Sequence, residues 1–308
     1  YYGPCTLANE ARIRGVKMLP PRLGWCGEQF RVEDVASDMD PQIIVPSGGI
    51  RVGLRQVSGL SAKARQMILK EFPPAPPIAV AHPSAMPWTS LVEFLQRCPV
   101  DRDEAARLIL IGFFDEINPH RRALLWSLPE LMDQIASMKG DLPLNVPQPQ
   151  APDEVQPMTQ AEMDIRERAI LGLDVHRHLM SHERERIIAK GGLTTAEVRR
   201  LKPGTQCWVV GNPIRLRFPP TASGRRVVFF DLEDESGLLN VTCFDETYRK
   251  DGHAIICSPY VTVKGQVQWR DGSTAFLASR VFPYSPEIRK LVEGVIELPV
   301  VKSDFLVG

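Results

Sequence analysis

The alternation of apolar and polar residues after Pro203 constrains the fold of this chain more than any other feature of its sequence. Turn sequences rich in Gly, Ser and Asp separate strand-like runs, and a short helical segment lies between the third run and the fourth. The runs occupy residues 205–217, 226–233, 238–244, 255–269 and 274–282, and the helical segment occupies residues 246–250. Five strands with a helix between the third and the fourth predict an OB-fold, a small Greek-key β-barrel.

The residues before Pro203 have helical periodicity instead. A short helix is expected over residues 4–14, followed by an extended segment over residues 16–20. Apolar residues recur at helical spacing over residues 61–71, 89–97, 101–112 and 119–138. A further helix over residues 159–171 would begin at a capping box formed by Thr159 and Glu162. The predicted fold class is α+β and multidomain: a helical helix-hairpin-helix region followed by a five-stranded OB-fold β-barrel.

Proline-rich segments and these changes of periodicity divide the chain into parts. Prolines interrupt residues 73–87, which form an insertion, and residues 140–157, which are expected to form a linker. The predicted parts are an N-terminal segment (1–50), a helix-hairpin-helix domain (51–139), the linker (140–157), a helical connector (158–202), the OB-fold (203–284) and a C-terminal tail (285–308).

Composition excludes some classes of protein. Basic and acidic residues number 37 each, so no global positive field argues for a nucleic-acid partner. No run approaches the roughly 18 uninterrupted apolar residues of a membrane span. The six cysteines include no CxxC pair, which favours reduced thiols in a cytoplasmic protein over a zinc site or a disulfide framework. The chain begins with neither Met nor a signal sequence, and we expect it to be an excised piece of a larger protein.

A glycine turn between two helical segments is the first candidate binding motif. Gly59 lets backbone amides approach a phosphate, and the next helix presents unsatisfied N–H groups at its N-terminus. Such a helix-hairpin-helix grips the backbone of duplex DNA without reading bases. An ordinary hairpin of two helices that needs a glycine to turn explains the same residues equally well. The predicted duplex-binding residues are Val57, Ser58, Gly59, Ser61, Lys63 and Arg65.

The second candidate is the outer face of the barrel. Alternation sends Val228, Phe230 and Leu232 into the barrel and leaves Phe229 on the opposite face, where a ring can stack on an unpaired base. An amide on the next strand can hydrogen-bond a base edge, and two arginines on the first strand can hold phosphates. A neighbouring domain that covers Phe229 is the alternative. The predicted single-strand-binding residues are Arg215, Arg217, Phe229 and Asn240.

Three other polar or aromatic clusters are interpreted as structural. Alternation places the acidic residues of the 231–235 segment on different faces, so we expect a solvated turn rather than a two-metal site. Two phenylalanines in the second glycine turn, 110–115, are expected to pack in a core, because its Asp115 would repel phosphate. The histidines have no HExxH spacing and no third ligand, so surface or packing roles are expected. The acidic residues are Asp231, Glu233, Asp234 and Glu235; the phenylalanines are Phe113 and Phe114; and the histidines are His176, His178 and His182. No catalytic residue, metal ligand or cofactor is therefore predicted for this chain.

The order of these parts resembles the C-terminal region of bacterial DNA polymerase III alpha subunits, the C-family. Residues 2–20 resemble the end of the fingers region, and residues 52–60 resemble the beginning of the family's helix-hairpin-helix region. Residues 88–94 and 110–115 resemble later segments of that region. Residues 229–237 are similar to the family's OB signature, which anticodon-binding barrels share and in which the matching Phe stacks on a base.

The resemblance implies a DNA-handling role. In such a polymerase the helix-hairpin-helix grips duplex DNA behind the active site and the barrel contacts the single-stranded template, during replication or translesion synthesis. The parent would be a nucleotidyltransferase whose catalytic aspartates, with Mg²⁺, lie upstream of this chain. The implied partners are duplex and single-stranded DNA and the rest of the polymerase. A sliding clamp has only a weak candidate motif, residues 141–144. The end of the chain soon after the barrel resembles the error-prone branch.

Two other interpretations remain open. In the first, the barrel's open face docks a partner polypeptide of a replication or repair assembly, and nucleic acid binds only incidentally; the zero net charge favours it. In the second, the chain is itself a polymerase or nuclease, which would require convergent carboxylates that the sequence does not offer.

Overall fold

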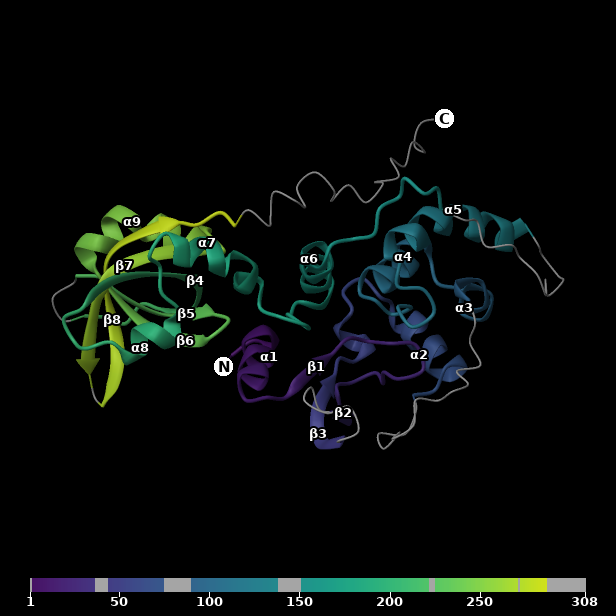
Figure 1. The fold of residues 1–308 in the computed structure, drawn as a ribbon, viewed down its shortest axis with the longest axis horizontal. Helices are drawn as coiled ribbons and strands as arrows, with labels where there is room; N and C mark the ends of the chain where they lie inside the picture. The colour runs from purple at the N-terminus through teal and green to yellow at the C-terminus, as the bar shows by residue number, and fades with distance from the viewer. Residues whose placement is uncertain are drawn as a thin grey trace. The chain divides into compact units, whose positions relative to one another are not determined.

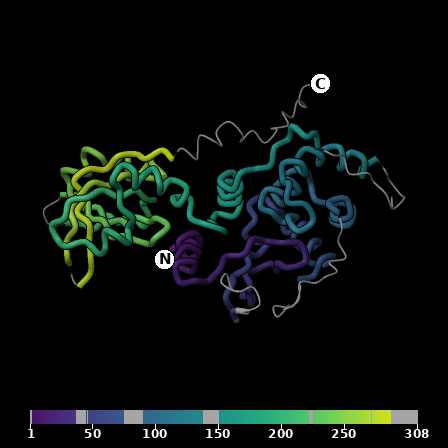
Figure 2. Tube along the Cα trace, viewed as in Figure 1, coloured from purple at the N-terminus to yellow at the C-terminus, as the bar shows by residue number. Residues whose placement is uncertain are grey.

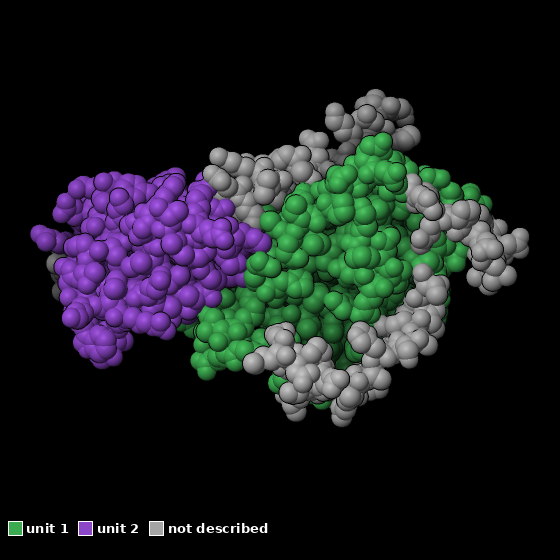
Figure 3. Space-filling model, in the orientation of Figure 1, with its two compact units in different colours: residues 1–177 green, residues 178–308 purple. Residues whose placement is uncertain are grey.

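The computed structural model describes residues 2–36, 44–74, 90–137, 151–221, 225–270 and 272–286. The chain divides into two compact units, Tyr1–Arg177 and His178–Gly308 (Figure 3). This division falls within the 158–202 segment. The 75–87 part of the proline insertion, the 141–144 motif, most of the 140–157 linker and nearly all of the 285–308 tail lie outside the described residues.

The helices of unit 1 begin and end within about two residues of the predicted positions. They are α1 (Pro4–Ile13), the 3-10 helix η1 (Leu54–Gln56), α2 (Ala62–Glu71), α3 (Leu91–Arg97), α4 (Arg102–Leu110), α5 (Arg121–Ser137) and α6 (Gln160–Leu171) (Figure 1). The predicted capping box of α6 is confirmed: the backbone N–H of Thr159 donates to Glu162 at 2.8 Å, and the Thr159 hydroxyl accepts from the Glu162 N–H.

A three-stranded sheet in unit 1 was not predicted beyond its first strand. Its strands are β1 (Lys17–Leu19), β2 (Arg31–Ala36) and β3 (Ile44–Arg51), in the order β1-β3-β2. The proline and glycines of β3 hide its strand character, because these residues are depleted in strands. The sheet is held by a buried ion pair, in which the Arg51 guanidinium donates to the Glu33 carboxylate at 2.8 and 2.9 Å and to the Pro20 carbonyl at 2.9 Å.

Aromatic side chains fill the core of unit 1. Phe113 and Phe114 are 2% and 1% exposed, and their rings contact each other and Phe94 edge to face, with centroids 4.9–6.1 Å apart. The prediction that the second glycine turn serves packing is therefore confirmed. Its Asp115 carboxylate accepts from the Arg121 guanidinium at 2.7 Å.

Arg121 is the centre of a buried ionic cluster. Its side chain is 3% exposed and also lies 2.8 Å from the carboxylate of Glu167, which is 1% exposed. The ring of His176 lies 3.5 Å from the same carboxylate. Burial raises the pKa of Glu167 to about 7, because the low-dielectric core penalises the charged form more than Arg121 stabilises it.

Unit 2 contains the predicted barrel. Its strands are β4 (Gln206–Arg217), β5 (Val227–Asp234), β6 (Gly237–Phe244), β7 (Val261–Arg270) and β8 (Ser273–Pro283), which close in the order β4-β5-β6-β8-β7 (Figures 1 and 2). The β6–β8 pair is parallel and the others are antiparallel. Val228, Phe230 and Leu232 are fully buried in the barrel, as alternation predicts. The predicted α+β fold class, with a five-stranded OB-fold, is confirmed.

The helix between the third and fourth strands is longer than predicted. Helix α9 spans Asp245–Cys257, so residues 255–257 belong to it and not to the fourth strand, which begins at Val261. Ala254 and Ile255 belong to the hydrophobic core of the barrel. From the sequence, the apolar residues from 255 onward were assigned to a strand, but Ile255 lies on the buried face of a helix.

The acidic segment at the β5–β6 turn is not a solvated turn, and that prediction was wrong. Asp234 is fully buried and Glu233 is 1% exposed. Three elements precede the barrel: the 3-10 helix η2 (Leu179–Glu183) and the helices α7 (Arg184–Ala189) and α8 (Thr195–Arg200). The helices α7 and α8 supply partners for this turn. Asp231, 5% exposed, contacts Arg215 of β4 instead.

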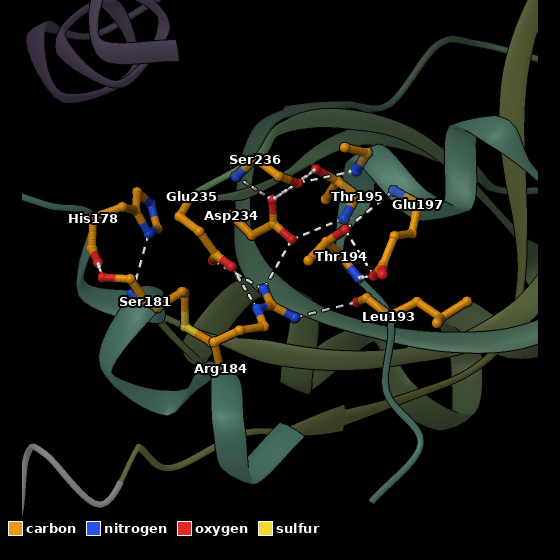
Figure 4. A network of polar contacts seen from close by, with 12 residues as sticks. His178, Ser181, Arg184, Leu193, Thr194, Thr195, Glu197, Asp234, Glu235 and Ser236 are labelled. Atoms are coloured by element: carbon orange, nitrogen blue, oxygen red, sulfur yellow. Dashed lines mark hydrogen bonds and ion pairs between the residues drawn. The ribbon is translucent and has the colours of Figure 1, made fainter. Parts of the chain in front are cut away.

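The Asp234 carboxylate is the centre of this network (Figure 4). It accepts from the backbone N–H and hydroxyl of Thr195 at 2.8 and 2.7 Å, and from the N–H and hydroxyl of Ser236 at 2.9 and 2.7 Å. The Arg184 guanidinium donates to Asp234 at 3.0 Å and also to Glu235. A buried charge with this many donors is well compensated.

The histidines have the expected surface and packing roles. His178 is 1% exposed, and its Nδ1 accepts from the Met180 N–H at 3.1 Å, which caps η2. His176 is exposed. In the described parts of the chain, no group of three or more His, Cys, Asp or Glu residues is arranged to hold a metal ion. The same parts contain no helix that is long and apolar enough to cross a membrane.

We expect Asp234→Ala to destabilise unit 2 by about 3–5 kcal/mol, because removing one partner leaves the buried Arg184 charge and the Thr195 donors uncompensated. Urea denaturation followed by circular dichroism measures the change. Glu246→Ala is the matched control, since Glu246 is exposed and, among the residues that the structure describes, forms an ion pair only with Lys250. Equal stability of the natural chain and the Asp234 variant would contradict the network's role.

We also expect Glu167 to make the stability of unit 1 depend on pH. Because its pKa is higher in the folded state, the folded chain holds an extra proton between pH 4.5 and about 7, and this contribution to stability is lost as the pH rises through 7. One pKa unit corresponds to about 1.4 kcal/mol. The difference in unfolding free energy between the natural chain and Glu167→Gln should therefore fall by about 2–3 kcal/mol from pH 5 to pH 8. A difference independent of pH would show that Glu167 stays ionised.

Candidate nucleic-acid interface

A groove of about 780 Å³ lies on the outer face of the barrel. Its walls include Arg217 and Phe218 at the end of β4, Phe229 of β5, Asn240 of β6 and Arg270 at the end of β7. We call this hollow the barrel groove. Three of the predicted single-strand-binding residues, Arg217, Phe229 and Asn240, therefore line one surface.

The register of the barrel explains this convergence. Arg217 pairs directly with Phe229 across β4 and β5, and Phe229 pairs with Thr242 of β6. Asn240 lies two residues before Thr242 and therefore points to the same outer face, one step along the strand. Phe229 is half-buried. Its ring is thus held by neighbouring strands while it lines the groove.

Arg215 does not line the groove. It lies at a β-bulge between Ile214 and Arg217, with a positive φ of 53°, and its guanidinium donates to the Asp231 carboxylate at 3.2 Å. The Asn240 side-chain amide donates to the same carboxylate, also at 3.2 Å. Asp231 therefore orients the side chain of Asn240 at the wall of the groove.

The basic side chains of the groove are available to an anion. Within the described parts of the chain, the guanidinium groups of Arg217 and Arg270 form no hydrogen bond or ion pair. Phe218 is 51% exposed and packs edge to face against Tyr248, with ring centroids 5.9 Å apart. The rings of Phe218 and Phe229 thus line the barrel groove together with the two arginines. This arrangement suits stacked bases and phosphates.

Sequence reasoning missed Phe218 and Arg270. Both lie at the ends of strands, beside the β4–β5 and β7–β8 loops. In OB-folds these two loops border the ligand-binding face, so the positions at the strand ends carried a usable signal.

The predicted hairpin has the expected glycine turn. Gly59 has a φ of +79°, and a Cβ there would lie 2.6 Å from the Arg107 guanidinium. However, the chain itself satisfies several amides of the turn. The Ser58 N–H donates to the Ile170 carbonyl at 3.0 Å and the Ser61 N–H to the Glu104 carboxylate at 2.8 Å.

The side chains of the hairpin also differ in availability. Val57 is 2% exposed and Arg65 donates to the Leu60 carbonyl at 2.6 Å, so both support the turn. Lys63 is exposed. Among the described residues, the side chains of Lys63 and Arg107 form no hydrogen bond or ion pair. Arg107 was not predicted, because α4 lies far from the hairpin in the sequence.

Comparisons with known proteins match both regions. The family described as helix-hairpin-helix motif matches residues 15–124, and the family described as OB-fold nucleic acid binding domain matches residues 207–288. Both the helix-hairpin-helix region and the OB-fold were predicted from the sequence.

Several similar proteins are named error-prone DNA polymerase. The chain is 31% identical to that of Symbiobacterium thermophilum over 91% of this chain and 28% of the relative. It is 26% identical to that of Dechloromonas aromatica, over 94% of this chain and 26% of the relative. The chain of Rhodopirellula baltica is 25% identical over 99% of this chain and 24% of the relative. This chain therefore spans about a quarter of these relatives' length. The predicted resemblance is confirmed: the chain is homologous to a segment of the error-prone DNA polymerases.

Proposed function

We propose that this chain is a DNA-handling region of an error-prone DNA polymerase and that its barrel groove binds single-stranded DNA. The observation that carries the proposal is the convergence of Phe229, Phe218, Arg217 and Arg270 on one groove. The match to a nucleic-acid-binding OB-fold family supports it independently.

Each group of the groove has a distinct part in this proposal. The ring of Phe229 stacks on a base, as does the exposed ring of Phe218, and stacking tolerates any base. Arg217 and Arg270 bind the flanking phosphates. The carbonyl oxygen of Asn240 accepts from a base edge, while one of its amide N–H groups donates to Asp231 and holds the side chain in place. The affinity for single-stranded DNA therefore comes mainly from aromatic stacking, and it depends little on base sequence.

We propose further that the hairpin grips the backbone of duplex DNA through side chains more than through amides. The Ser58 and Ser61 amides already have partners within the chain. The cations left to contact phosphates are Lys63, at the start of α2, and Arg107, beside Gly59. Arg65 has a supporting role in this proposal, because it holds the Leu60 carbonyl.

The nucleotidyl transfer of such a polymerase, and the Mg²⁺ that it requires, belong in this proposal to parts of the parent outside this chain. The chain contributes the hold on the DNA. Protein docking on the barrel face is the rival, and binding measurements on variants of the groove and the hairpin separate the two.

We expect Phe229→Ala to weaken binding of single-stranded DNA by about 1–3 kcal/mol, which is roughly 5–150-fold in Kd, because one base loses its stacking partner. Fluorescence anisotropy with a labelled oligothymidylate measures it. Phe244→Ala is the control, since Phe244 is 49% exposed on the same barrel but does not line the groove. Equal losses in the two variants would contradict the proposed stacking.

We expect Lys63→Ala and Arg107→Ala each to weaken duplex binding and to reduce the slope of log K against log salt by about 0.9, because each removes one phosphate contact. Anisotropy of a labelled duplex at several salt concentrations measures both quantities. Lys70→Ala removes the same charge from the far end of α2 and should change neither. An unchanged slope in both hairpin variants would remove the hairpin from the DNA interface.

A further inference from the structure

A second hollow, of about 400 Å³, lies beside helix α9. Its lining includes Arg226 at the start of the β5 region and Asp245, Tyr248, Arg249, His253 and Ile256 of α9. We call it the α9 hollow. No binding role was predicted for these residues from the sequence.

A pair of aromatic rings forms a wall between the two hollows. Phe218 lines the barrel groove and Tyr248 lines the α9 hollow. The two rings meet edge to face at 5.9 Å and an interplanar angle of 74°. A DNA strand that stacks on the exposed side of the Phe218 ring would therefore reach the α9 hollow by passing over this ring pair.

A glycine inside α9 makes room for the ring pair. A Cβ at Gly252 would lie 2.8 Å from the Tyr248 ring, so the ring can lie back against the helix only because that Cβ is absent. Glycine inside a helix costs about 1 kcal/mol relative to alanine. The position of Tyr248, and with it the shape of the α9 hollow, depends on this residue.

The charges of the α9 hollow suit an anion. Arg226 is exposed, and its guanidinium forms no hydrogen bond or ion pair within the described ranges of the chain. Asp245 is the one acidic residue in the lining, and it already accepts from the Arg226 backbone N–H at 3.1 Å and pairs with Arg249 at 2.9 Å. His253 is exposed beside them. Two arginines thus face solvent, and one of them, Arg249, also pairs with the one carboxylate of the lining, which leaves the hollow with a net positive charge.

We infer that single-stranded DNA bound in the barrel groove continues over Phe218 into the α9 hollow, where Arg226 and Arg249 bind its backbone phosphates. This inference rests on the proposed function of the barrel groove. It makes the site longer than the groove alone, and OB-folds occupy about 4–16 nucleotides each. A short oligonucleotide fills the groove only, and a longer one contacts both hollows.

The test compares two oligonucleotide lengths on the full chain. Labelled dT4 and dT12 are titrated by fluorescence anisotropy against the natural chain, Arg226→Ala and Arg249→Ala. We expect each variant to bind dT12 about 3–10-fold more weakly, with a salt slope smaller by about 0.7, and to bind dT4 within about twofold of the natural chain. Lys250→Ala is the matched control: it removes a charge from α9 outside the hollow and should change neither.

The outcomes separate this inference from the proposed function. If Phe229→Ala weakens both oligonucleotides while Arg226→Ala and Arg249→Ala weaken neither, the groove binds DNA and the extension is wrong. If the two arginine variants weaken dT4 and dT12 equally, their effect is not one of site length, and the extension is also wrong. If Phe229→Ala changes nothing, the proposed function itself fails.

Discussion

Closure of the barrel is the constraint on which the candidate binding face depends. Once β4 pairs with both β5 and β7, every strand must send alternate side chains inward, and the residues between them have only the outer face. Phe230 and its inward neighbours fill the interior, which leaves Phe229 outside beside Arg217. The hydrophobic effect that fills the barrel thus also positions an aromatic ring on its surface.

Local periodicity was enough to predict most elements and the direction of the barrel residues. The start of α6 followed from the Thr159–Glu162 capping box, and the inward face of β5 followed from strict alternation. The strands β2 and β3 were missed because Pro and Gly interrupt the pattern of β3, the strand that joins the sheet together. Alternation did not predict the burial of Asp234, because the residues that bury its carboxylate belong to α7 and α8, about 40–50 residues away in the sequence.

The candidate site shows the same division between local and distant information. Phe229 and Arg217 are close in the strand ladder, so the sequence pattern brought them together. Arg107 reaches the hairpin through packing that no local pattern encodes. Phe218 and Arg270 instead lie at strand ends beside the two loops that border the ligand-binding face of OB-folds, a signal that the alternation argument did not use. Arg215 has the residue type of a phosphate ligand, yet a bulge turns it toward Asp231. At the hairpin, the pattern identified the turn but not which amides the fold had already used.

The ion pairs between Arg184 and the β5–β6 turn limit where recombination can cut such a barrel out of its parent protein. Five strands and α9 do not supply all the partners that this turn needs, because the buried Asp234 carboxylate takes several of its donors from residues that come before the barrel in the chain. A recombination event that joined the barrel to another protein at residue 203 would leave the Asp234 carboxylate without its partners Arg184 and Thr195. The transferable piece is residues 178–286 as a whole, and its preceding helices are as much a part of the fold as any strand.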